Sequence, residues 1–169
     1  FVRYQNQKKM IETIYETQEA VKKRKKGGIM GSINHSVIQR NLIIQFFVKY
    51  EGVYTAVPEL SLDLNGKERV PDLSIYKKLS TQIGNDEIRT KKMPLAVIEI
   101  LSPTQSLSEL VTKSNEYFDA GISSYWLVAP DVETIFIYRA KNQRTTFTDN
   151  AILKDTYLEV ELSLVDIFA

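Results

Sequence analysis

Glu99 is the only charged residue in the apolar run PLAVIEIL, which spans residues 94 to 101. An ionised carboxylate among apolar side chains needs a partner, because burial without one costs several kcal/mol or shifts the pKa until the group is neutral. Asp72 is a second carboxylate, and it follows Pro71 at the start of another strand-like segment. If the two strands are neighbours, both carboxylates can bind one hard divalent cation, since Mg²⁺ takes one or two carboxylates and keeps waters that substrate phosphates replace.

The period of a strand places Val97, Glu99 and Leu101 on one face. Glu99 is then a lone carboxylate on an otherwise apolar face. The spacing also allows a simpler interpretation, in which Asp72 caps a turn and Glu99 pairs with a lysine. The residues alone leave both interpretations open.

Three segments carry a resemblance to a known family: VPDLSIY (70 to 76), LAVIEILSP (95 to 103) and KSNEYFDAGISSYWLVAPD (113 to 131). In this order they resemble the bacterial branch of the PD-(D/E)XK nuclease superfamily whose members are described as restriction-type endonucleases. The resemblance covers roughly residues 34 to 140. It implies a restriction-endonuclease-like α/β core with a central mixed sheet flanked by helices, and metal-dependent hydrolysis of DNA phosphodiester bonds.

Lys113 is the matching residue for a lysine that has migrated. The usual E-x-K motif of the superfamily would place lysine at position 101, where this chain has Leu101. In the branch that this chain resembles, the lysine is thought to lie on the following helix, from which its long flexible stem can reach the same point. Its role would be to orient the attacking water and to offset charge in the transition state. The alternative is an ordinary i,i+4 surface pair between Glu109 and Lys113.

The resemblance also implies the metal ligands. Asp72 and Glu99 would hold Mg²⁺, or Mn²⁺ in its place, and the backbone carbonyl of Ile100 would add a ligand. His35 is the only histidine and stands at the start of a predicted helix, where it could contact a phosphate or the water shell of the metal. A cap or surface role for His35 is the alternative.

We therefore expect a nuclease that acts on nucleic acid, with DNA as the expected substrate. A homodimer is expected by analogy, because cutting both strands needs two sites. The competing hypothesis is a catalytically inactive nuclease-like module that binds nucleic acid or a partner protein. The absence of lysine at position 101 favours that module, whereas the combination of Asp72, Glu99 and Lys113 favours the enzyme.

The pattern along the chain predicts the elements that position these residues. Asn34 is a candidate N-cap for the second helix, and Ser106 and Glu109 fit a capping box for the helix that ends at Gly121. A mixed sheet flanked by helices follows from the order of elements. We expect helices at about 7–26, 34–50 and 107–120, strands at 53–57, 60–64, 72–76, 94–101, 124–130 and 134–140, and a loop or short helix at 77–92. Near the end of the chain we expect one more short strand or hairpin and a final turn of helix.

Composition narrows the function classes. A chain of 169 residues is expected to form a single domain, and its formal charge of +1 favours no class of partner. The absence of cysteine excludes disulfides, thiolate zinc sites and a cysteine nucleophile.

No signal-peptide pattern or membrane-length apolar run is present, so a cytoplasmic protein is expected. Five consecutive bases, Lys22 to Lys26, would suit either the DNA backbone or the negative end of a helix dipole.

Overall fold

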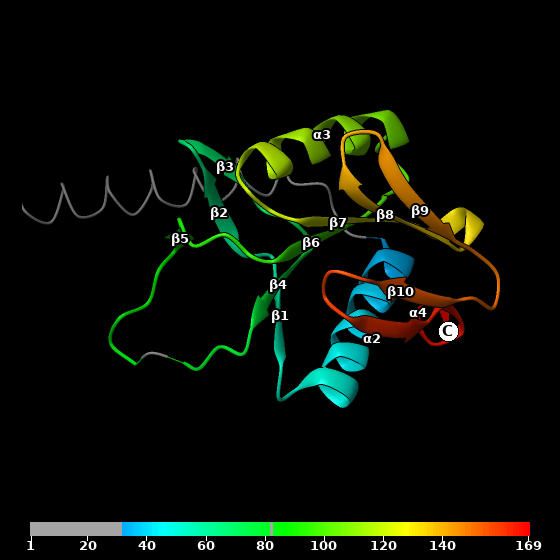
Figure 1. Cartoon of the computed structure of the whole chain (residues 1–169), viewed down its shortest axis with the longest axis horizontal. Helices are drawn as coiled ribbons and strands as arrows, with labels where there is room; N and C mark the ends of the chain where they lie inside the picture. The colour runs from blue at the N-terminus through cyan, green and yellow to red at the C-terminus, as the bar shows by residue number, and fades with distance from the viewer. Residues whose placement is uncertain (1–31, 82) are drawn as a thin grey trace, which may run out of the picture. The chain divides into compact units, whose positions relative to one another are not determined.

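The central sheet contains six strands, β1 (Tyr54–Pro58), β4 (Leu73–Lys77), β6 (Ala96–Ile100), β7 (Ser124–Ala129), β8 (Thr134–Ala140) and β9 (Gln143–Phe147), side by side in that order (Figure 1). The structure is a computed structural model that describes residues 32–81 and 83–169. β6 and β7 are parallel, whereas the other neighbouring strands of this sheet are antiparallel. A parallel pair requires a crossover, and α3 (Leu107–Asp119) provides it.

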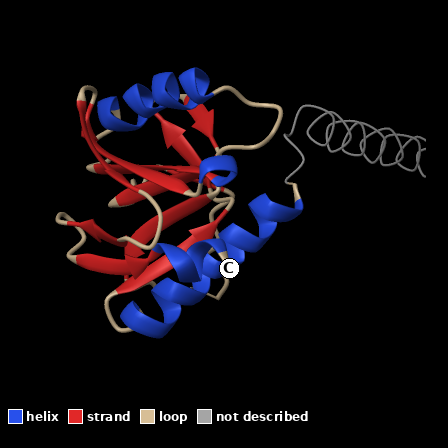
Figure 2. Ribbon diagram, turned by 90° about the vertical axis from the view of Figure 1, so that its right-hand side faces the viewer, coloured by secondary structure: helices blue, strands red, loops and turns tan. Residues whose placement is uncertain are grey.

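Other elements cover both faces of the central sheet (Figure 2). One face packs against α3 and a small sheet of three strands, β3 (Lys67–Arg69), β2 (Ser61–Leu64) and β5 (Arg89–Thr90). The other face packs against α2 (Ile33–Tyr50), the hairpin of β10 (Ile152–Asp155) and β11 (Val160–Ser163), and α4 (Leu164–Phe168). The sheet therefore has an apolar core on each side.

β6 contributes to both cores, which explains why its sequence is almost continuously apolar. Ile98 and Ile100 are buried in the cluster that contains the apolar face of α2. Val97 is buried in the cluster that contains Leu110 and Tyr117 of α3. Because successive residues of a strand point to opposite faces, Glu99 shares the α3 side with Val97.

The ends of α3 match the sequence prediction. Ser106 accepts a hydrogen bond from the backbone N–H of Glu109, and the Glu109 side chain accepts one from the backbone N–H of Ser106, so the capping box is confirmed. At the other end Gly121 has a φ of 89°, a left-handed conformation that suits glycine. The N–H of Ile122 bonds to the carbonyl of Tyr117, which completes a Schellman motif and fixes the last turn.

The N-cap of α2 is Ser32, so the prediction of Asn34 was wrong. Ser32 has an extended backbone, and its hydroxyl accepts a hydrogen bond from the N–H of His35 at 3.3 Å. Asn34 lies inside the first turn. Serine and asparagine cap helices about equally well, so two candidates two residues apart could not be separated by residue type.

Two short strands were not predicted. Asn65 and Gly66 both have positive φ angles, 55° and 95°, as a tight hairpin turn requires, and they connect β2 to β3. The polar segment 77–92 is mostly loop, and it contributes β5 as a parallel neighbour of β2. The end of the chain forms three strands, β9, β10 and β11, where one short strand or hairpin was expected, and the expected final turn of helix is present as α4.

The predicted helix at 7–26 and the basic run Lys22 to Lys26 lie outside the described residues. Residues Ser32–Ala169 form one compact unit. The expectation that a single domain spans residues 1 to 169 therefore stays a prediction. Among the described helices, none is long and apolar enough to cross a membrane.

Candidate active site

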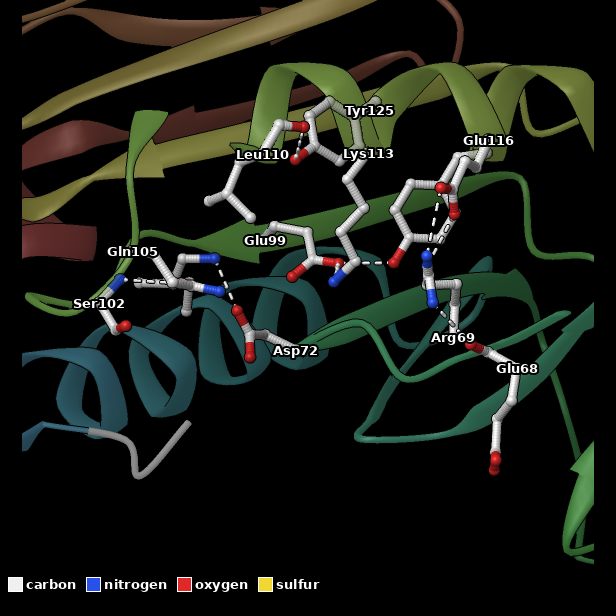
Figure 3. Close-up of polar contacts among 12 residues, drawn as sticks. Glu68, Arg69, Asp72, Glu99, Ser102, Gln105, Leu110, Lys113, Glu116 and Tyr125 are labelled. Carbon is white, nitrogen blue, oxygen red and sulfur yellow. Dashed lines mark hydrogen bonds and ion pairs between the residues drawn. The ribbon is translucent and has the colours of Figure 1, made fainter. Parts of the chain in front are cut away.

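Asp72 directly precedes β4, and Glu99 lies on the neighbouring strand β6. β4 and β6 are antiparallel with Leu73 opposite Ile98, so extending the register by one residue places Asp72 opposite Glu99. Directly opposed residues of an antiparallel pair have Cβ atoms about 4.5–5.5 Å apart and point to the same face. The two carboxylates are thus brought together from positions 27 residues apart in the sequence, and Figure 3 shows both below the helix that carries Lys113.

Three contacts hold Asp72 in place. Its Oδ2 atom accepts a hydrogen bond from the backbone N–H of Ile100 at 2.6 Å. Its Oδ1 atom lies 3.0 Å from Nε2 of His35. Its backbone carbonyl accepts a hydrogen bond from the side-chain amide of Gln39 at 2.9 Å. Asp72 is therefore attached to both β6 and α2 just before β4 begins.

His35 is buried in the first turn of α2, with 8% of its surface exposed. The hydrogen bond to Asp72 raises the pKa of His35, and this effect outweighs the burial that lowers it. His35 thus contacts a predicted metal ligand from the opposite side of the sheet. Its interpretation as a surface residue is wrong, because its side chain faces Asp72 instead of solvent.

Glu99 is the most enclosed carboxylate of the candidate site, with 3% exposure. Its Oε1 atom lies 2.5 Å from Nζ of Lys113 and accepts a hydrogen bond of 2.5 Å from the hydroxyl of Tyr117. Burial raises the pKa of Glu99. The contacts with Lys113 and Tyr117 lower this pKa, whereas the charge of Asp72 raises it. The net direction is upward. The lone carboxylate of the apolar strand is thus partnered by a cation and a hydroxyl from α3.

Lys113 approaches Glu99 from α3, as the migrated-lysine prediction requires (Figure 3). Its ammonium nitrogen also lies 5.8 Å from the ring centroid of Tyr117, one helical turn along. Glu109 binds the backbone of Ser106 and makes no ion pair with Lys113 in the described part of the chain. The simple surface pair between Glu109 and Lys113 is therefore not formed.

Leu101 occupies the position where the wider superfamily has lysine. It packs, partly buried, against the core cluster on the α3 side. This is the face of β6 that carries Glu99, so a side chain at position 101 would approach the same site. Leu101 thus contributes apolar surface to the site, and the positively charged side chain is that of Lys113.

Arg69 and Glu116 are neighbours of the site that sequence reasoning missed. Arg69 on β3 donates from Nε to Oε2 of Glu116 at 2.7 Å and from Nη2 to Oε1 at 3.1 Å, a bidentate pair (Figure 3). Lys67 also contacts Glu116, at 2.5 Å. Glu116 precedes Tyr117 on α3, so this cluster attaches the β2–β3 hairpin to the helix that carries Lys113. No local pattern links residues 69 and 116.

The donor set fits a divalent cation that keeps several waters. Across the described residues there is no group of three or more His, Cys, Asp or Glu that could hold a metal ion. Two opposed carboxylates are the number that Mg²⁺ commonly takes from a protein. No described residue donates a hydrogen bond to Oε2 of Glu99, so this oxygen has lone pairs available.

Comparisons with known proteins support the family and the fold. A family model described as "Uma2: Putative restriction endonuclease" matches residues 28–165. A crystal structure titled as a putative nuclease belonging to DUF820, from Anabaena variabilis ATCC 29413, is similar with 28% sequence identity and a TM-score of 0.70, and the match covers 83% of each chain. No curated protein matches this chain. The resemblance stated from the sequence and the predicted fold class are both confirmed.

Proposed function

The chain belongs to the Uma2 family, described as "Putative restriction endonuclease", and on this premise we propose that it hydrolyses phosphodiester bonds of DNA with a divalent metal ion. The observation that carries the proposal is the convergence of Asp72, just before β4, Glu99 on β6 and Lys113 on α3. Two carboxylates and one ammonium group are the parts that metal-assisted hydrolysis of a phosphodiester needs.

Asp72 and Glu99 would hold Mg²⁺ or Mn²⁺ through their carboxylate oxygens. The backbone carbonyl of Ile100 is proposed as a further ligand. In a strand the N–H and C=O of one residue face the same neighbour, and the N–H of Ile100 already bonds to Asp72. The Ile100 carbonyl therefore lies along the edge of β6 that Asp72 occupies. When bound, the cation would supply Lewis acidity and lower the pKa of a coordinated water.

The residues of the chain then have separate roles in the proposed reaction. Lys113 orients the attacking water and offsets the negative charge that develops on the phosphoryl oxygens. Glu99 holds the Lys113 ammonium group through Oε1, which leaves Oε2 for the cation. His35 acts behind Asp72, where its hydrogen bond keeps the carboxylate turned toward β6.

Isothermal titration of the protein with Mn²⁺ and Mg²⁺, followed by incubation with DNA and RNA, tests this proposal directly. We expect metal-dependent cleavage of DNA that EDTA abolishes. Asp72→Asn should lower metal affinity by about tenfold or more, because it removes one of two charged ligands. Asp63→Asn is a matched control, since Asp63 on β2 accepts hydrogen bonds from the N–H of Gly66 and from Arg89 of β5.

A protein that binds DNA but cuts neither DNA nor RNA with any divalent metal would refute the enzyme and favour the nuclease-like binding module. Equal metal affinity in Asp72→Asn and Asp63→Asn would refute the metal site. Homodimeric assembly and a cytoplasmic location stay predictions, and size-exclusion chromatography with light scattering tests the first of them.

A further inference from the structure

We propose that Tyr117 is a positioning residue for the candidate metal site, which sets the rotation of the Glu99 carboxylate and thereby decides which oxygen faces the cation. This inference rests on the proposed function and adds a residue to it. It follows from the contacts of one oxygen atom, Oε1 of Glu99.

Two donors converge on Oε1. The Tyr117 hydroxyl donates to it at 2.5 Å, and Nζ of Lys113 lies 2.5 Å away. The other oxygen, Oε2, accepts no hydrogen bond from a described residue. A carboxylate bound on one oxygen by two donors cannot rotate freely, so Oε2 is held away from Lys113 and Tyr117, where we place the proposed cation. Either donor alone would leave the carboxylate more freedom to rotate.

The position of the Tyr117 ring does not depend on Glu99. Tyr117 is fully buried and stacks on Tyr125 with ring centroids 5.7 Å apart. Its backbone carbonyl is tied to Ile122 in the Schellman motif at the end of α3. Packing and the helix end therefore place the hydroxyl, and the hydroxyl in turn can orient Glu99. Tyr117 can therefore orient Glu99, whereas Glu99 is not needed to orient Tyr117.

The Tyr117 hydroxyl is suited to donate at neutral pH. A tyrosine hydroxyl has an ordinary pKa of about 10 and can donate, and this one lies 2.5 Å from Oε1 of Glu99. A hydrogen bond from a neutral donor to an ionised acceptor is stronger than one between neutral groups. Tyr117 thus supports the ionised form of Glu99 without adding a charge that would compete with the cation.

Tyr117→Phe removes the hydroxyl and keeps the buried ring. Tyr125→Phe is its matched control, because the Tyr125 hydroxyl is also buried but donates to the carbonyl of Leu110, at 3.1 Å (Figure 3). We expect Tyr117→Phe to lower Mn²⁺ affinity by about tenfold, in line with the loss of one charge-assisted hydrogen bond. We expect kcat to fall by a similar factor while KM for DNA stays constant. Tyr125→Phe should match the wild type in all three quantities.

The outcomes distinguish this inference from the proposed function. If the wild type cuts DNA and Tyr117→Phe equals Tyr125→Phe in metal affinity and kcat, the inference is wrong and the nuclease stands. If the wild type binds Mn²⁺ but never cuts, the proposed function fails, and the comparison of metal affinities still decides the role of Tyr117. If the wild type binds no metal, both fail.

A double-mutant cycle distinguishes an effect of Tyr117 on Glu99 from a general loss of protein stability. If Tyr117 acts through Glu99, the variant Glu99→Gln/Tyr117→Phe should bind Mn²⁺ no more weakly than Glu99→Gln alone. Additive losses in the cycle would mean that Tyr117 acts through the fold in general and would overturn the inference. Thermal melting of all four proteins gives the stability part separately.

Discussion

The ammonium group of Lys113 lies 2.5 Å from Oε1 of Glu99, although the two residues belong to different elements, α3 and β6. Glu99 is almost fully enclosed, and 23% of the Lys113 side chain is exposed. The pair therefore couples the candidate chemistry to the stability of the fold, because removing the lysine leaves a buried carboxylate without its cation.

Lys113→Met should abolish cleavage while the aliphatic stem still packs near Tyr117. The loss of the cation should also lower the free energy of unfolding by about 1–3 kcal/mol, since Glu99 then has only the Tyr117 hydroxyl as a donor. Cleavage assays and urea denaturation measure the two effects. Lys154→Met is the control, because Lys154 pairs with Glu161 on the β10–β11 hairpin, at 2.8 Å. Wild-type cleavage by Lys113→Met would remove Lys113 from the mechanism.

Leu101→Lys on the Lys113→Met background should recover part of the lost cleavage. Position 101 shares a face of β6 with Glu99, so a lysine there can address the same water. The gain should be partial, because Leu101 packs against the α3-side core and its replacement disturbs that packing. Activity of the double variant is compared with Lys113→Met under the same metal concentration. No recovery at any Mg²⁺ or Mn²⁺ concentration would show that position 101 cannot serve the site in this chain.

Local sequence patterns predicted the strands and helix ends that carry the candidate site. Pro71 and the apolar and aromatic residues of the LSIY segment after it marked the start of β4, and the capping box with Gly121 marked both ends of α3. These signals depend on residues within a few positions of each other, so a single sequence contains them. The sequence did not show whether the segments that carry Asp72 and Glu99 are neighbours, and the β4–β6 register shows that they are.

The contacts around the carboxylates were not predictable in the same way. His35 meets Asp72 and Arg69 meets Glu116 only because strands and helices distant in sequence pack together. Such contacts depend on register and on side-chain direction, and composition carries no information about either. Tyr117 is a buried tyrosine of α3 whose hydroxyl has its partner only through the position of Glu99 on β6.

Glu116→Gln should loosen the attachment of the β2–β3 hairpin to α3. Burial raises the pKa of Glu116, but the hydrogen bonds from Lys67 and Arg69 outweigh it and lower the pKa overall. A carboxylate with a lowered pKa in the folded state stabilises the fold above its unfolded pKa, about 4.3, and this stability is lost as the pH falls through the folded value. Wild type should exceed Glu116→Gln in unfolding free energy by about 1 kcal/mol at pH ~7, with the difference vanishing below pH ~4.

Urea denaturation of both proteins across this pH range measures the difference. Glu161→Gln is the control, because Glu161 pairs with the exposed Lys154 far from α3 along the chain. A gap between wild type and Glu116→Gln that stays constant down to the lowest pH would contradict the ionic origin of the contact. A gap of zero at neutral pH would show that Arg69 and Glu116 do not stabilise the fold.

Neutralising the basic run Lys22 to Lys26 should weaken nucleic-acid binding if these side chains contact phosphates. Each phosphate contact that is lost should reduce the slope of log K against log salt by about 0.9 on duplex DNA. A variant with all five residues changed to glutamine is compared with wild type by fluorescence anisotropy at several salt concentrations. A second variant with Lys141, Lys154 and Arg144 changed to glutamine removes three positive charges elsewhere and shows whether any loss of positive charge changes the slope. If the slope falls in the first variant and not in the second, the basic run contacts the DNA backbone. Equal slopes in the wild type and the first variant would mean that the run interacts with the helix dipole instead.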